Sequence, residues 1–289
     1  MGTGPSDYLQ IIAEPSQRAP VTAAIFSFLS DQTDIDLLDL HQIRRETPEP
    51  GEIEQATCLA VDLPSTYEAY VEGLSKSLRY DVRRLDRKEF RDGSARFVIP
   101  DDPRLAMDTL FEQHIKRWKS RGLPGAFLGR AHSFHHQWAA RALERGWLRV
   151  SILEHQGQPI GAIYAMTLHG VCYYYQAGFD PAASTLSPGT LLVAQTIRSA
   201  INEGVHTFDF CRGDEPYKRR WKPQHVYTNV RLVLPTGTGI GRAGLGRLGG
   251  SWNRWAWGVE SKVRAKLEGG SLKIGSNRPK KPEKGTVSP

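Results

Sequence analysis

The sequence contains no long apolar run. No stretch of about eighteen uninterrupted apolar residues occurs among its 289 residues, and its first residues lack the basic, apolar and small-residue succession of a secretion signal. These absences argue against a membrane-spanning helix and a leader peptide, so we expect a cytoplasmic protein. The composition, 39% hydrophobic and 24% charged, is typical of a globular protein with room for one large domain or two modest ones.

Cysteine is also scarce. The three cysteines are Cys58, Cys172 and Cys211, and each lies in a strand-like apolar stretch with no CxxC spacing. A disulfide scaffold and a cysteine zinc site are therefore both unsupported. We expect three reduced thiols in the core.

The net charge of +7 is unevenly distributed along the chain. Residues 236–289 contain eleven Lys or Arg residues against three Glu, a local charge of +8, so the rest of the chain carries −1. This balance argues against a body built to bind nucleic acid. Any contact with a polyanion is therefore expected in the basic tail, residues 236–289.

The tail is rich in glycine, and we expect disorder over its end, which has almost no apolar side chains. Before that end, residues 251–268 place Trp252, Trp255 and Val259 on one helical stripe, with Lys and Arg between them. This amphipathic pattern is typical of a peripheral contact with the inner face of a membrane, and packing onto the folded body is the alternative. RNA is a third possible partner of this stripe, and that interpretation applies only if the protein uses a charged tRNA as a substrate.

Apolar spacing predicts an α+β order for the rest of the chain. Helices are expected over residues 20–30, 67–90, 103–122, 133–145 and 188–203, and strands over 35–40, 58–63, 96–99, 148–152, 160–168, 171–177, 207–211 and 226–234. The turns around Gly157 and Gly170 are short. Strands joined by such tight turns form an antiparallel meander, so residues 148–177 are predicted to do so.

A small-residue segment follows the meander and opens the next helix. Ser187, Pro188, Gly189 and Thr190 stand at its start, after a loop that begins at Gly178. Backbone N–H groups at such a start are free, and small side chains let a diphosphate approach closely. The alternative is an ordinary helix cap, with Ser187 capping and Pro188 at the first helical position.

The densest polar and aromatic cluster lies in residues 208–221. Asp209 stands between two phenylalanines of a predicted core strand, where a carboxylate needs a partner. Arg212 or a later cation could form a structural ion pair with it, and a catalytic role is the alternative. Glu215, Tyr217 and Lys218 follow a glycine turn and could converge on a cleft. There Lys218 could stabilise an oxyanion, and Glu215, Asp209 or Tyr217 could transfer a proton.

Three further patterns are weaker. Five cations recur at helical spacing, which is typical of a solvated face paired with Asp81 or Asp86, or of a site for an anionic substrate; they are Lys76, Arg79, Arg83, Arg84 and Arg87. His132, His135 and His136 have the helical spacing of metal ligands, but no carboxylate or cysteine near them in the sequence completes a set. We therefore expect no metal site. A GxGxxG match at Gly239 follows no intact strand, so we reject it as a dinucleotide site.

Several of these pieces together resemble a known family. They are Leu78-Arg79 with Arg83-Arg84, the runs 145–147, 161–162, 173–180 and 186–190, and above all the run 208–221. The segment from Leu78 to about Leu234 resembles the acetyltransferase-like domain of the GNAT superfamily in CelD-like (cellulose-biosynthesis) or BioF-like acetyltransferases, relatives of the FemAB peptidyltransferases.

The resemblance implies a mixed, mostly antiparallel sheet flanked by helices, with the acyl donor where two strands splay apart. It places the donor diphosphate at residues 187–190 and implies acetyl-CoA or another acyl-CoA as co-substrate, without a metal. The usual Q/R-x-x-G-x-G/A donor loop is not intact here, and FemAB relatives use aminoacyl-tRNA instead. The implied substrate-binding residues are Arg79, Arg83, Tyr175, Gln176, Asp180, Arg212 and Trp221.

We therefore expect an N-acyltransferase whose acceptor is an amine on a sugar, a nucleotide-linked precursor or an envelope component. The alternatives are a non-catalytic accessory protein of polysaccharide biosynthesis and an aminoacyl-tRNA-dependent peptidyltransferase. The expected divisions are 1–74 as a partial first GNAT-like unit, 75–235 as the acyltransferase domain and 236–289 as the tail. Because the first unit lacks early elements, the true start could lie upstream.

Overall fold

The computed structural model describes residues 6–235, apart from 33–34, 36, 91–92 and 124. The predictions for residues 236–289, the amphipathic stripe of 251–268 included, lie outside the described residues. None of the described helices is long and apolar enough to cross a membrane.

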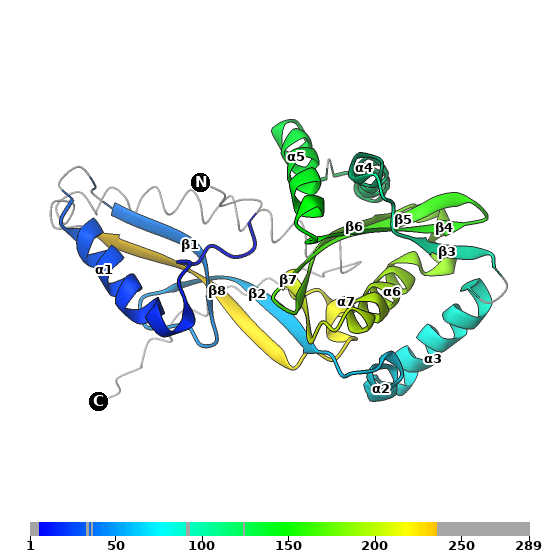
Figure 1. The fold of residues 1–289 in the computed structure, drawn as a ribbon, viewed down its shortest axis with the longest axis horizontal. Helices are drawn as coiled ribbons and strands as arrows, with labels where there is room; N and C mark the ends of the chain where they lie inside the picture. Colours follow the sequence, from blue (N-terminus) through cyan, green and yellow to red (C-terminus); the bar gives the residue numbers. More distant parts are fainter. Residues whose placement is uncertain (1–5, 33–34, 36, 91–92, 124, 236–289) are drawn as a thin grey trace, which may run out of the picture. The chain divides into compact units, whose positions relative to one another are not determined.

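The described strands form one mixed sheet with helices on both faces, which confirms the predicted α+β class (Figure 1). The strands are β1 (Leu37–Arg45), β2 (Ile53–Asp62), β3 (Ala95–Val98), β4 (Leu148–His155), β5 (Gln158–Leu168), β6 (Val171–Phe179), β7 (Thr207–Arg212) and β8 (His225–Pro235). The helices are α1 (Arg18–Ser30), α2 (Tyr67–Gly73), α3 (Lys76–Leu85), α4 (Pro103–Lys119), α5 (Arg130–Glu144), α6 (Pro188–Asn202) and α7 (Pro216–Arg219). Short helical turns cover Pro15–Gln17, Asp86–Phe90 and Pro181–Leu186.

The sheet runs in the order β1-β8-β2-β7-β6-β5-β4-β3. The meander β4-β5-β6 is antiparallel, as its turn residues predict. Gln156 and Gly157 both have positive φ, as do His169 and Gly170, which is the backbone that a tight hairpin turn requires. The expected helix over 67–90 is divided, because Leu74 leaves the helical conformation and the Ser75 side chain caps α3.

Two apolar cores lie on opposite faces of the sheet. One contains residues from α2, α3 and α6, and the other contains residues from α4 and α5 (Figure 1). Helix α4 approaches β6 so closely that a Cβ atom on Gly178 would lie 2.2 Å from the backbone nitrogen of His114. Only glycine fits there, so this position fixes the distance between α4 and the sheet.

Strand β2 pairs with both β7 and β8 in this sheet. The boundary that the sequence suggests after residue 74 falls in the short link between α2 and α3, and both helices contribute to one core. The division into a partial first unit and an acyltransferase domain stays a prediction.

Strands β6 and β7 separate part-way along their length, and the candidate site lies at this point. These two strands are parallel and pair only from Val171 with Thr207 to Tyr173 with Asp209. Beyond that pair β6 continues to Phe179 and β7 continues to Arg212 without further pairing to each other. A bulge at Tyr175 in β6 lies just past the last pair. Irregular strands at such a point leave backbone groups available to a ligand.

Candidate active site

Asp209, at the last pair of β6 and β7, is surrounded by polar partners. It is 1% exposed, and its carboxylate accepts hydrogen bonds from the Tyr8 hydroxyl, at 2.9 and 3.0 Å to its two oxygens, and from the backbone N–H of Cys211 at 2.7 Å. The Arg44 guanidinium lies 3.6 Å away. The sequence predicts Arg212 or a later cation as the ion-pair partner of Asp209, whereas the structure places Arg44 there.

Burial controls the protonation of this pair. It raises the pKa of Asp209 above its ordinary value, against the opposite effects of the Cys211 N–H, the Tyr8 hydroxyl and Arg44. Burial and the nearby Asp209 charge also raise the pKa of Tyr8 far above its ordinary value. Tyr8 therefore keeps its proton and donates it in a hydrogen bond, while Asp209 has a higher proton affinity than a surface carboxylate.

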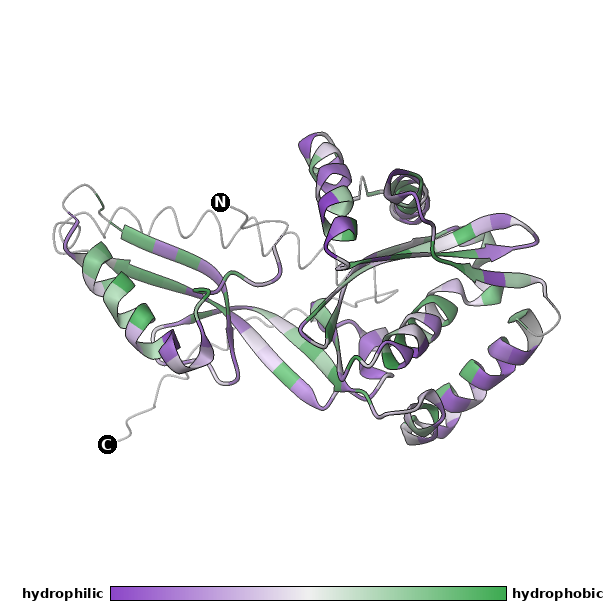
Figure 2. Ribbon diagram, in the orientation of Figure 1, coloured by the Kyte–Doolittle hydropathy of each residue, from purple (hydrophilic) through white to green (hydrophobic). Residues whose placement is uncertain are grey.

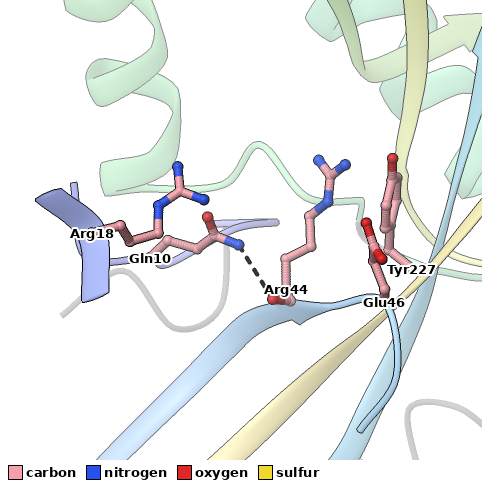
Figure 3. Close-up of a pocket in the computed structure, with 5 residues that line it drawn as sticks. All are labelled: Gln10, Arg18, Arg44, Glu46 and Tyr227. Atoms are coloured by element: carbon pink, nitrogen blue, oxygen red, sulfur yellow. Dashed lines mark hydrogen bonds between the residues drawn. The ribbon is translucent and has the colours of Figure 1, made fainter. Parts of the chain in front are cut away.

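Arg44 connects this pair to a cavity of about 380 Å³. The cavity is lined by Gln10, Arg18, Arg44, Glu46 and Tyr227. The Arg44 guanidinium lies 3.4 Å from the centre of the Tyr227 ring, a cation–π contact that holds it in place. Figure 3 shows the side chains of Arg18, Arg44 and Tyr227 extending in the same direction. Two guanidinium groups against the single carboxylate of Glu46 give the lining a net positive charge, which favours an anionic ligand.

Lys218 lies in a second polar cluster, after the end of β7, and its ammonium is already occupied. It donates to the carbonyl oxygens of Arg212 at 2.8 Å and Gly213 at 3.2 Å, and lies 2.8 Å from a Glu215 carboxylate oxygen. The ammonium therefore makes two hydrogen bonds to backbone carbonyls and an ion pair with Glu215. The Glu215 carboxylate lies against Gly213, where an added Cβ would be 2.6 Å away. Lys218 and Glu215 thus hold the turn between β7 and α7.

The other residues predicted in this run are buried or half-buried. The Tyr217 hydroxyl lies 3.4 Å from that of Tyr174, and burial raises the pKa of Tyr217. Trp221 is 3% exposed and belongs to the core. Arg212 lies 3.3 Å from Asp7 in the N-terminal segment.

The start of α6 is not an ordinary cap. Ser187 has a φ of 52°, and its side chain makes no capping hydrogen bond, so the alternative of a Ser187 side-chain cap is wrong. The backbone N–H groups of Thr190 and Leu191 both point to the Ser187 carbonyl, and Pro188 has no N–H. Gly189 remains as the small residue at the helix start.

Arg117 of α4 also reaches this region, and the sequence patterns do not predict it. Gly189 lies against the Phe179 ring, where an added Cβ would be 3.6 Å from the nearest ring atom. The Arg117 guanidinium lies 4.6 Å from the centre of the same ring, and its Nη1 donates to the Ala177 carbonyl at 3.5 Å. Its Nε–H is buried with no acceptor among the described residues. A donor of this kind is suited to a ligand oxygen.

Helix α3, mostly hydrophilic in Figure 2, carries the predicted basic stripe, and two of its cations pair with an acidic residue of α2. Arg79 lies 2.8 Å from a Glu72 carboxylate oxygen, and Arg83 bonds to the other oxygen. The expected partners Asp81 and Asp86 instead contact Arg220 and Arg198.

The remaining predicted substrate residues lie along β6 and after it. Tyr175, at the bulge, packs beside Tyr164 at 5.4 Å between ring centres, and burial raises its pKa to about 12. Gln176 pairs across the sheet with Tyr164. Asp180 caps the turn that follows by accepting from the Ala182 N–H at 2.9 Å.

Comparison with known proteins identifies the fold. The model of a family described as "Acetyltransferase (GNAT) domain" matches residues 76–219. These residues are a GNAT acetyltransferase domain. The match contains β6, α6 and β7, so the separating strands belong to this domain. The chain is therefore a transferase enzyme of the acyl-transfer type, with the mixed sheet that the sequence resemblance implies.

Solved structures extend the similarity of fold beyond the GNAT domain. FemX is 10% identical, with a TM-score of 0.52 over 77% of this chain and 70% of that chain. L-PGS from Bacillus licheniformis is 14% identical, with a TM-score of 0.52 over 80% of this chain and 77% of that one. No curated protein sequence matches the chain significantly.

Proposed function

We propose that this enzyme transfers an acyl group from an acyl-CoA donor to an amine, at the point where β6 and β7 separate. The observation that carries the proposal is Asp209. It combines a raised pKa with a place at the last pair of these strands, beside a cavity lined by two arginines. A proton acceptor at the edge of an opening in the sheet is what amine acylation requires.

The donor diphosphate would bind at the start of α6. The positive end of the α6 helix dipole and the small Gly189 suit phosphate oxygens. Arg117 adds a cation over the neighbouring Phe179 ring. The acyl chain would then follow β6 into the opening, where backbone groups near the bulge at Tyr175 are the natural partners for the carbonyl oxygen.

The chemistry then needs few groups. A neutral amine attacks the thioester carbonyl, and backbone N–H groups of β6 stabilise the negative oxygen of the tetrahedral intermediate. Tyr8 takes the proton of the amine as it passes its own proton to Asp209. The intermediate then expels the CoA thiolate, and the proton on Asp209 returns through Tyr8 to that sulfur. The C–N bond forms as the C–S bond breaks, so protons and charge balance.

We place the acceptor in the cavity lined by Arg18 and Arg44. The two guanidinium groups that line this cavity suit an amine that carries a phosphate or carboxylate, such as a nucleotide-linked or envelope precursor. Polysaccharide precursors belong to the same class. A peripheral membrane contact through residues 251–268 would bring the enzyme to such a precursor. Flotation of the full chain and of one ending at Pro235, with anionic and neutral vesicles, tests that contact.

Calorimetry with acetyl-CoA, longer acyl-CoAs and CoA tests the donor. The change Gly189→Asp should weaken binding at least about tenfold by adding a negative charge at the phosphate position, whereas Gly189→Ala adds only an ordinary contact with Phe179. Arg117→Met should weaken binding by a similar factor, and Lys119→Met, on the exposed end of the same helix, is its matched control. Equal binding by all four variants would remove this region from the donor site.

A second donor is favoured by the absent Q/R-x-x-G-x-G/A loop and by the likeness of fold to FemX. If no CoA compound binds to the folded chain, aminoacyl-tRNA becomes the donor to test, by retention of a charged tRNA against the same tRNA without its amino acid. If neither binds, the accessory role in polysaccharide biosynthesis is preferred.

A further inference from the structure

Three side chains on α4 and α5 form a cluster outside the acyl-transfer site. Asp108 of α4 and His132 and His136 of α5 each offer a ligand atom, and these atoms all lie within 4.8 Å of one another. The His136 Nε2 is 2.9 Å from an Asp108 carboxylate oxygen. Asp108 comes from another helix, so the sequence does not show it as a partner of these histidines. The expectation that no carboxylate completes the set is therefore wrong.

The helices hold the two histidines in a defined arrangement. His132 and His136 are four residues apart on α5, so both rings extend from the same face of the helix. The buried Phe111 of α4 packs against both, at 4.4 and 5.1 Å between ring centres. This apolar wall limits the positions that the imidazoles can adopt. His135 does not join the cluster, since its buried ring packs against Phe127 and Tyr164 instead.

We propose that Asp108, His132 and His136 bind Zn²⁺, or a similar late first-row divalent cation, with water in the fourth position. Imidazole nitrogens and one carboxylate oxygen are ligands that Zn²⁺ prefers. Ligand atoms about 2.1 Å from a tetrahedral zinc lie about 3.4 Å apart. The present contact of 2.9 Å and the 4.8 Å limit bracket that value, so small side-chain rotations are enough to form the site.

Bound zinc would join α5 to α4, and these helices cover one face of the β4-β5-β6 meander. The site is independent of the proposed acyl transfer, because none of its three residues takes part there. Residues 236–289 contain no histidine or cysteine, so the tail adds no nitrogen or sulfur ligand.

Calorimetry with ZnCl₂ on the full-length, tag-free chain, first treated with a chelator, tests the proposal. We expect one zinc per chain, and loss of one ligand in His132→Ala or Asp108→Asn should weaken binding by more than about tenfold. The matched control is His225→Ala. His225 Nε2 also lies 2.8 Å from an aspartate oxygen, on Asp62, but without a second histidine in a described three-ligand group, so its loss should leave zinc affinity unchanged.

Two results would overturn the proposal. One is that the unmodified chain binds no zinc, and the other is that His225→Ala weakens binding as much as His132→Ala does. Should a variant fail to fold, Co²⁺ on the unmodified chain gives a second measurement. A visible d–d spectrum of low-symmetry coordination, saturating at one equivalent and removed by Zn²⁺, supports the site, and the spectrum of hydrated Co²⁺ alone contradicts it.

Discussion

Two polar clusters lie around the end of β7, and they differ in where their partners come from. The Asp209 carboxylate is bound by Tyr8, which is 201 residues away in the sequence, and by Arg44 of β1. The Lys218 ammonium is bound by groups within six residues of it, two of them backbone carbonyls. The first cluster adjoins a cavity, whereas the second closes a turn.

This difference suggests a catalytic role for the Asp209 cluster and a structural role for the Lys218 cluster. Lys218 donates to two carbonyls of the turn and lies beside the Glu215 carboxylate, so we expect it to hold this turn rather than to stabilise an oxyanion. Asp209 is bound by a tyrosine whose own oxygen can still accept a proton, and it lies where two strands open. The site residues are therefore expected in the cluster assembled from distant segments.

The largest effect should come from Lys218→Met. The change leaves the half-buried Glu215 carboxylate and two carbonyls without the buried Lys218 ammonium, which should lower the free energy of unfolding by about 3 kcal/mol and Tm by about 10 °C. Lys222→Met is the control, because the Lys222 ammonium binds only the Gly73 carbonyl among the described residues, at an exposed position. Loss of turnover with an unchanged Tm in Lys218→Met would return Lys218 to the mechanism.

Asp209→Asn should lower turnover by about a hundredfold or more, since the amide takes no proton. The pKa of Asp209 is raised, so in the unmodified enzyme the rate should fall with decreasing pH at a higher pH than an ordinary carboxyl gives. The residual rate of the variant should lack that decline. The pH profile of turnover measures this, and an unchanged profile would place Asp209 in the scaffold with Lys218.

Acid should weaken the fold through two histidines that belong to neither cluster. The pKa values of His114 and His135 are lowered to about 4 by burial, and the His114 Nε2 accepts from the Ala126 N–H, which a protonated ring cannot do. In the unfolded chain these histidines have their ordinary pKa of about 6.5, so they bind protons at a higher pH there than in the folded chain. Their contribution to the free energy of unfolding is therefore fully present above pH 6.5 and is lost as the pH falls toward 4. Tm measured from pH 7 to 4.5 should fall less in His135→Phe.

The smallest effect is expected from Arg83→Met. Arg83 pairs with Glu72 on an exposed surface, where solvent screening leaves such pairs little effect on stability. Tm and donor affinity should both stay unchanged. A clear rise in the KM of the acceptor would show instead that α3 contributes to substrate binding.

The sequence could predict what neighbouring residues determine. Alternation between Leu148 and Ile152 and the turn at Gly157 specify the meander, and two phenylalanines around Asp209 show that its carboxylate is buried. The partners of Asp209 could not be found in this way. In the sequence Tyr8 belongs to an apolar run, with no sign of a polar partner. Only the folded sheet brings it to Asp209, which is 201 residues later in the chain. Arg117 and Asp108 were missed for the same reason.

The most direct test of the acyl-transfer site compares Tyr8→Phe with Tyr173→Phe. The two rings pack together at 6.5 Å, but it is the Tyr8 hydroxyl that binds Asp209. Release of the CoA thiol from acetyl-CoA, followed with a panel of amino sugars and nucleotide-linked amines, gives the rate. We predict that Tyr8→Phe lowers it about a hundredfold with a small change in Tm, whereas Tyr173→Phe retains it. Equal rates in the two variants would contradict a proton path through Tyr8 to Asp209.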